Sequence, residues 1–271
     1  MHSRHFASAY IELDEFQSNG EGEEAIPVKI TSIGRRELVL PPPFTLITLR
    51  EAGDAFAHAQ AVAGEAGAGT LVWARRFDLI DCAVVLEPAE PLALARLAFY
   101  PAMNALADAL AAHCAPEHPL TFDWPDGIRL DGVPVGDGRL AWPEGARDAA
   151  VPDWLVFGAR LRVATLDGPG EGEGALGIDE LGGLEGDAEG LVESFARHLM
   201  ANLHGFSDDR GVSQVLHYVE RLAPRDSGDS SFSVDVNGDL LVTTGRDRRR
   251  RLFVEALARH GERDAEGRLR P

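Results

Sequence analysis

At 271 residues and 45% hydrophobic composition, the chain is long enough for one main folded domain with an additional segment. Its formal net charge of −18 argues against nucleic acid and anionic membranes as partners, because their phosphates would repel it. No apolar run reaches the roughly 20 residues that a membrane span requires, and no apolar signal-peptide core stands at the N-terminus, so we expect a cytoplasmic protein.

The first 43 residues form a predicted N-terminal extension, part of it disordered. The stretch Ser18–Glu24 is polar and acidic, and three prolines at 41–43 make a stiff spacer before the first regular pattern. A translation start placed too far upstream would produce the same pattern. We predict a main domain over residues 44–205 and a small C-terminal appendage over residues 206–271, whose core is too small to fold alone.

The main domain is predicted to begin with two helices that flank two strands. In chain order, the elements are a helix over Asp54–Glu65, strands over Thr70–Trp73 and Cys82–Leu86, and a helix over Leu92–His113. Asp54 suits the N-cap of the first helix. A short connection, Ala74–Asp81, joins the strands, and Pro101 should kink the second helix or mark its first turn.

The cysteines and histidines do not indicate a metal site. Cys82 and Cys114 cannot build a disulfide framework or a four-ligand zinc site. Cys82 lies in an apolar, strand-like run, where a buried core thiol is the simplest interpretation and a nucleophile is the alternative. The nine histidines lack the spacing of paired metal ligands, so we assign neither a metal ligand nor a catalytic residue.

Aspartate–glycine pairs divide the next segment into short strands. The predicted strands are Leu120–Trp124, Ile128–Leu130, Val133–Val135, Arg139–Trp142 and Leu155–Ala164. The pairs Asp126-Gly127, Asp131-Gly132 and Asp137-Gly138 separate the first four, and such pairs are strong hairpin signals. The segment is therefore predicted to be an antiparallel meander.

An acidic segment and further small elements complete the chain. We interpret Asp167–Glu185 as a solvated loop, with a lid over a site as the alternative. The later predicted elements are helices over Ala188–His204 and Val212–Leu222, strands over Phe232–Val236 and Leu240–Thr243 with an Asn237-Gly238 turn, and a helix around Arg251–Arg259. The basic run Arg248–Arg251 is typical of a solvated helix face, and docking to the acidic loop is the alternative.

The most informative motif is the block Phe122–Gly132. Trp124, one of four tryptophans in the chain, stands directly before Pro125 between two predicted strands. Alone, the block is typical of a hairpin whose tryptophan packs in the core. Together with the order of the elements around it, the block resembles the Lys-Trp-Pro-Asn-Asp signature of the biotin- and lipoate-protein ligase family, over roughly Phe44–His204.

This resemblance implies an α+β fold of the class II aminoacyl-tRNA synthetase and biotin ligase type. Such a fold has a mixed or antiparallel sheet covered by helices, here with a small C-terminal α/β appendage. The resemblance also implies a set of substrate-binding residues: Trp124, Pro125, Asp126, Gly127 and Arg129. In the family the tryptophan packs beside the ligand. Asp123 replaces the family lysine that contacts ligand and adenylate, and Arg129 is the nearest replacement cation, which we expect to substitute only in part.

Two further family patterns imply phosphate-binding residues. Between the first two strands the family carries a Gly-Arg-Gly-Arg-x-Gly loop, whereas Ala74–Asp81 contains no glycine and offers only the charges of Arg75 and Arg76. A Gly-x-Gly-x-Asn strand of the family resembles the stretch that begins at Gly158. This stretch keeps the first glycine and places Arg162 at the asparagine.

The chemistry of the family sets the functional expectation. A ligand carboxylate attacks the α-phosphate of ATP, and a lysine of a carrier domain then attacks the adenylate. The resemblance therefore implies ATP and Mg²⁺, a biotin- or lipoate-like carboxylic acid as ligand, and a biotinyl or lipoyl carrier domain as partner. The altered nucleotide-binding patterns leave an alternative, a non-catalytic relative that binds a small carboxylate, an adenylate or a carrier domain.

Overall fold

The structure, a computed structural model, describes residues 37–164, 177–178, 187–209, 211–223 and 230–259. The chain divides into two units, residues 1–35 and 36–271, and the description concerns the second. Most of the predicted N-terminal extension and nearly all of the predicted acidic loop Asp167–Glu185 lie outside the described residues.

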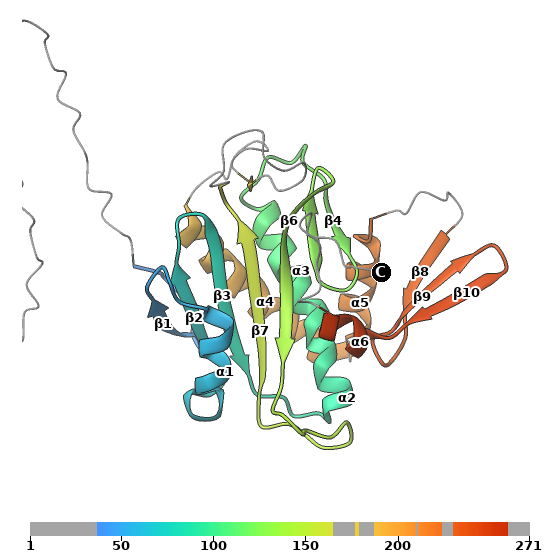
Figure 1. Cartoon of the computed structure of the whole chain (residues 1–271), viewed down its shortest axis with the longest axis horizontal. Helices are drawn as coiled ribbons and strands as arrows, with labels where there is room; N and C mark the ends of the chain where they lie inside the picture. Colours follow the sequence, from blue (N-terminus) through green and yellow to red (C-terminus); the bar gives the residue numbers. More distant parts are fainter. Residues whose placement is uncertain (1–36, 165–176, 179–186, 210, 224–229, 260–271) are drawn as a thin grey trace, which may run out of the picture. The chain divides into compact units, whose positions relative to one another are not determined.

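A seven-stranded sheet forms the central layer of this unit (Figure 1). Its strands, in spatial order, are β1 (Thr45–Leu49), β2 (Thr70–Arg75), β3 (Leu79–Leu86), β7 (Leu155–Arg162), β6 (Val133–Ala141), β5 (Gly127–Leu130) and β4 (Leu120–Asp123). Strands β1 and β2 run parallel, and all other neighbours are antiparallel. The predicted mixed sheet is confirmed, and β1 is a strand that the sequence analysis missed.

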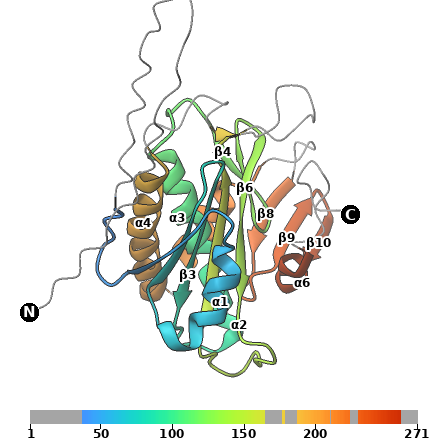
Figure 2. The same ribbon diagram turned by 60° about the vertical axis from the view of Figure 1, so that its left-hand side comes forward.

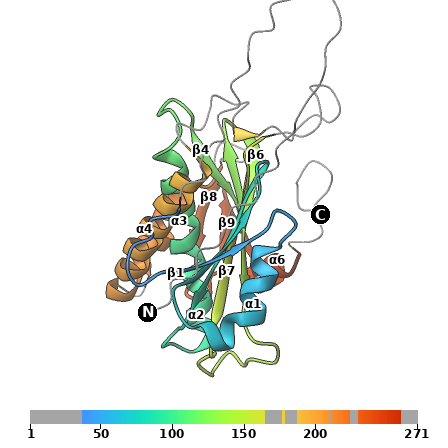
Figure 3. The same cartoon turned by 90° about the vertical axis from the view of Figure 1, so that its left-hand side faces the viewer.

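Helices cover both faces of this sheet. Figures 2 and 3 show α3 (Phe99–Ala111) and α4 (Ala188–Asp209) on one side and α1 (Ala55–Ala66) on the other. The long helix predicted over Leu92–His113 is split into α2 (Leu92–Ala95), a 3₁₀ turn at Arg96–Ala98, and α3. Pro101 lies in the first turn of α3, where its missing N–H costs no hydrogen bond.

Strand alternation divides the apolar residues between two clusters. Phe157 and Leu161 of β7 belong to the larger cluster, which contains the buried residues of α3 and α4. Val156 of the same strand and Ala83 of β3 belong to the smaller cluster beneath α1. Successive side chains of a strand point to opposite faces, so the cluster assignments show which face each strand residue occupies.

Two predicted connections are wrong, because the structure places strand there. Arg75 still belongs to β2 and Leu79 already to β3, so only a tight turn remains of the connection Ala74–Asp81. The pair Asp137-Gly138 lies inside β6, in register with β7. Gly138 is needed there because a Cβ would collide with Met103 of α3 and the Phe157 ring.

The C-terminal residues form α5 (Val212–Glu220), a three-stranded sheet and α6 (Phe253–Ala258). The small sheet has the order β10 (Asp247–Arg251), β9 (Leu240–Thr244) and β8 (Ser230–Val234). The predicted β8–β9 hairpin is confirmed, with Gly238 at a φ of 85° in its turn. The arginine run, expected on a helix, lies on β10 because a turn with Gly245 at a φ of 59° returns the chain onto β9.

An aromatic cluster joins this C-terminal part to the main sheet. Phe253 stacks on Tyr100, with ring centroids 5.2 Å apart, and contacts Phe99 at 5.5 Å. Tyr218 of α5 stacks on Phe122 at 4.6 Å. The expectation that the C-terminal residues pack on the preceding part is thus met, since both share one core.

Candidate functional site

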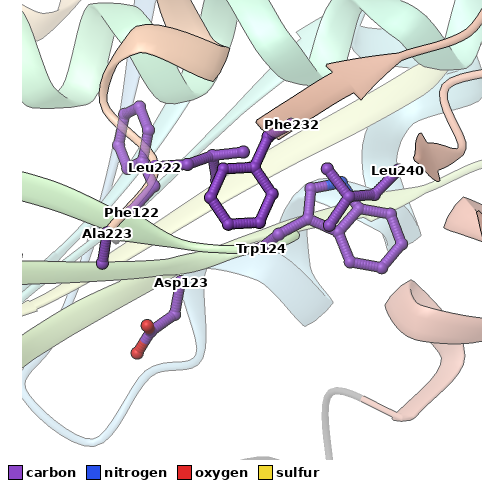
Figure 4. Close-up of a pocket in the computed structure, with 7 residues that line it drawn as sticks. All are labelled: Phe122, Asp123, Trp124, Leu222, Ala223, Phe232 and Leu240. Carbon is purple, nitrogen blue, oxygen red and sulfur yellow. The ribbon is translucent and has the colours of Figure 1, made fainter. Parts of the chain in front are cut away.

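Trp124 lies on the α3 side of the sheet. It is 3% exposed, and its Nε1–H donates to Tyr100 Oη at 3.3 Å. It also lines a small pocket, together with Phe122, Asp123, Leu222, Ala223, Phe232 and Leu240 (Figure 4). Most of the pocket residues are apolar, and the Asp123 carboxylate points away from Phe122 and Leu222 (Figure 4).

Trp124, Pro125 and Asp126 form a buried turn between β4 and β5. Tyr218 donates through Oη to the Pro125 carbonyl at 2.6 Å. Asp126 is fully buried, and its carbonyl accepts from Gly138 N–H at 2.9 Å. Gly127 begins β5. Pro125 and Asp126, two of the predicted substrate-binding residues, therefore contact other residues of the protein itself.

Arg75 and Arg76 do not converge. Arg75 lies 5.3 Å above the Trp73 ring, and Trp73 belongs to the cluster on the α3 side. Arg76 forms two hydrogen bonds to Asp78, of 3.2 and 2.9 Å. This pairing lowers the pKa of Asp78 and closes the turn between β2 and β3.

A charged face occupies the opposite side of the sheet, the side that carries α1. We define it by six side chains from β3 to β7: Asp81, Asp123, Arg129, Asp137, Arg139 and Arg160. Each aspartate has an arginine partner, at 2.5 Å for Asp123–Arg129, 3.7 Å for Asp137–Arg139 and 3.6 Å for Asp81–Arg160. The predicted residues Gly158 and Arg162 alternate with core residues of β7 and lie on the same side of the sheet.

The Asp123–Arg129 pair compensates the reversed charge at the motif. Arg129 donates through Nε to Asp123 at 2.5 Å and through Nη1 to the Gly132 carbonyl at 2.6 Å. The guanidinium thus stands beside the position where the family has its lysine. The pair carries no net charge, so it does not restore the positive charge of a lysine at this position, and the role of Arg129 as a partial substitute stays a prediction.

Arg160 lies between two acids of different burial. Its Nε is 3.6 Å from Asp81, whose side chain is 2% exposed, and its Nη2 donates to Asp54 at 3.2 Å. Burial raises the pKa of Asp81, and Arg160 opposes that rise. For Asp54, burial acts to raise the pKa, but the Ala57 N–H and the Arg160 charge outweigh it, so this pKa is lowered. The Ala57 contact, at 2.9 Å, confirms Asp54 as the N-cap of α1.

Phe56 of α1 occupies the space into which a side chain at position 158 would extend. A Cβ there would lie 2.5 Å from the Phe56 ring of α1. The glycine therefore lets α1 approach the sheet, and its retention has a packing reason.

Gly158→Ala is expected to lower the free energy of unfolding by about 1–3 kcal/mol, because the added methyl overpacks a rigid ring. Urea denaturation measures this change. Gly64→Ala is the matched control, since nothing lies within 4 Å of its exposed position on α1. The control should be neutral or gain up to about 1 kcal/mol. Equal stability of Gly158→Ala and the parent protein would contradict the packing role.

Sequence reasoning missed Asp81, Asp137, Arg139 and Arg160 as members of a charged face. Asp81 had a signal, because it is the lone acid in an otherwise apolar strand. Arg160 also had a signal, since it lies two residues from Gly158 and from Arg162 and therefore on the same face of β7. Cys82, by contrast, is buried in the core as its simplest interpretation states, and burial raises the pKa of its thiol.

The charged face suits phosphate or carboxylate better than a protein-held metal ion. Arginine donors match both anions in pairs of hydrogen bonds. Among the described residues, no group of three or more His, Cys, Asp and Glu side chains is arranged to hold a metal ion. Mg²⁺ commonly binds through phosphates and water, so this finding is compatible with magnesium arriving with a nucleotide.

No helix in the described part of the chain has the length and apolarity to cross a membrane.

Comparisons with known proteins agree with this fold. A biotin protein ligase-like protein of unknown function from Silicibacter sp. TM1040 is 23% identical, with a TM-score of 0.70 over 82% of this chain and 99% of that one. The biotin protein ligase of Aquifex aeolicus, solved with biotin and ATP, is 16% identical, with a TM-score of 0.56 over 77% and 95%. That of Leishmania major, solved with biotin, is 14% identical, with a TM-score of 0.52 over 78% and 98%.

No curated protein matches the chain in sequence. A family model does match, over residues 40–219, and it covers the seven-stranded sheet, its helices and the charged face. The chain therefore belongs to the biotin/lipoate A/B protein ligase family.

Proposed function

We propose that the protein activates a small carboxylic acid of the biotin or lipoate type with ATP and transfers it to a lysine of a carrier domain. The charged face is the observation that carries this proposal. It holds arginines on adjacent strands of a rigid sheet, each oriented by an aspartate. Membership of the family and the fold shared with a ligase solved with biotin and ATP support the same reaction class.

The proposed reaction places negative charge where these arginines lie. A carboxylate oxygen of the acid attacks the α-phosphorus of ATP, and pyrophosphate leaves. The carrier lysine then attacks the acyl carbon, loses a proton, and AMP leaves. Arg129 and Arg160 would stabilise the charge on phosphate during the first step, and their aspartates would hold them in place beforehand. Magnesium would be held largely by phosphate oxygens.

Release of pyrophosphate tests the proposal. The purified full-length protein is mixed with ATP and Mg²⁺, and biotin, lipoate or octanoate is added in turn, with a sample lacking acid as the control for ATP hydrolysis. We expect release that depends on one of the acids. Binding of an acid by calorimetry without pyrophosphate release for any of them would contradict the proposal and favour the non-catalytic alternative.

A further inference from the structure

We propose that Arg160 is the anion anchor of the charged face, and that Asp81 positions it. The anchor binds either the carboxylate of the acid or a phosphate of ATP. This inference rests on the proposed function and assigns one part of it to a residue that the family pattern does not supply. Arg160 stands at the second glycine of the family's Gly-x-Gly-x-Asn strand, so its side chain is particular to chains that depart from that pattern.

The register of the sheet places Arg160 at the centre of the charged face. Strand β7 lies between β3 and β6. Arg160 is directly opposite Asp81 of β3 on one side and Asp137 of β6 on the other. A ligand lying across these strands would therefore meet this guanidinium.

Arg160 is fixed at its base and open at its tip. Its Nε is buried and lies 3.6 Å from Asp81, which is too long for a hydrogen bond. Among the described residues, its hydrogen-bond partner is Asp54, which accepts from Nη2 at 3.2 Å. The side chain is still 29% exposed. Most of the donors of this guanidinium thus remain for a ligand.

Two other arginines near this edge of the sheet, Arg76 and Arg129, have used more of their donors. Arg76 already makes a two-fold contact with the Asp78 carboxylate. Arg129 donates through both Nε and Nη1. Arg160 can therefore donate two parallel hydrogen bonds to a carboxylate or a phosphate more readily than Arg76 or Arg129 can.

The two acids at Arg160 differ in how readily they can release it. Asp81 has a side chain 2% exposed and keeps the guanidinium in place, because separating the pair would strand a buried charge. Asp54 has a side chain 47% exposed and loses little when water replaces its partner. An incoming anion can therefore displace Asp54 while Asp81 holds the guanidinium in position.

Calorimetric titration with two separate probes tests the anchor and identifies its ligand group. Lipoate presents a carboxylate, and ATP presents phosphates. Arg160→Gln should weaken binding of one of them by about 10- to 100-fold, because a charged hydrogen bond is lost. Arg160→Lys should regain part of that loss. Arg248→Gln is the control, since it removes the same charge from an exposed position on β10 and should change neither affinity.

Variants of the two acids test the positioning. Asp81→Asn should weaken the same probe as Arg160→Gln and leave the other unchanged, whereas a merely structural loss would weaken both. Asp54→Asn keeps a good helix cap and removes a competing charge, so it should tighten that probe by about 2- to 5-fold. Thermal unfolding of each variant shows that it is folded. If Arg160→Gln does not fold, the affinity of Asp54→Asn decides whether Arg160 binds the anion.

Three results would overturn the anchor: unchanged affinities in a folded Arg160→Gln variant, equal losses in Arg160→Gln and Arg248→Gln, or no binding of either probe by the parent protein. Unchanged affinity in Asp54→Asn would equally count against it. Failure of the proposed function looks different. In that case lipoate or ATP binds through Arg160, but the parent protein releases no pyrophosphate with any acid.

Discussion

Replacing Phe253 with alanine is expected to lower the free energy of unfolding by about 3–5 kcal/mol. The ring is fully buried and contacts Phe99, Tyr100 and Trp124, which come from α3 and from the motif. Its removal leaves a cavity at the junction of the two sheets. Urea denaturation followed by tryptophan fluorescence and by far-ultraviolet circular dichroism measures the loss.

Val254→Ala is the matched control for this prediction. Val254 follows Phe253 on α6 but is 37% exposed, so its truncation should change stability by less than about 0.5 kcal/mol. The seven-stranded sheet and the C-terminal residues share one core. Tryptophan fluorescence and circular dichroism should therefore report the same single transition in the parent protein and in both variants. Two separate transitions, only one of which shifts in Phe253→Ala, would show that residues 206–271 form an independent unit.

Replacing Arg129 with glutamine is expected to reduce acid-dependent pyrophosphate release by about 100- to 1,000-fold, as loss of a donor at developing charge does in other enzymes. Arg129 is the cation beside the position where Asp123 replaces the family lysine. Without it, Asp123 would present an uncompensated negative charge to the phosphate. Initial rates of pyrophosphate release at saturating ATP measure the effect.

Arg249→Gln is the control for this prediction. Arg249 is also paired with an aspartate, Asp247 at 2.8 Å, but lies exposed on β10. Its loss should leave the rate unchanged and cost at most about 1 kcal/mol of stability. Arg129→Lys keeps the charge but cannot reach both Asp123 and the Gly132 carbonyl with a rigid fork, so we expect an intermediate rate. A parental rate in Arg129→Gln would remove Arg129 from the reaction.

Features that depend on neighbouring residues were predictable from the sequence. Asp54 caps α1 because its carboxylate reaches an N–H only three residues away. The Asn237-Gly238 turn needs only a glycine that accepts positive φ. Alternation along the predicted strand Leu120–Trp124 would also have placed Trp124 on the same side as Phe122 and Asp123 on the other.

Features that depend on distant segments were not predictable in the same way. Asp137-Gly138 has the composition of a turn, yet Met103 of α3 needs the space above Gly138 and β7 pairs with β6 there. Asp81 and Arg160 meet only through the register of two strands that are far apart in sequence. A single sequence carries the pattern of each strand but not the register between them.

Strand β10 is an outer strand of the small sheet in the described part of the chain, and four arginines follow one another along it. The open edge of a sheet is a template on which another molecule can add a strand and begin to aggregate. Two such edges could pair only by bringing arginine runs to within about 5 Å of each other. Arg249 and Arg250 are paired with aspartates, so the repulsion comes from the charge that these pairs leave uncompensated, and it weakens as salt is added. Such a run disfavours strand addition at this edge through its charge and needs no particular partner.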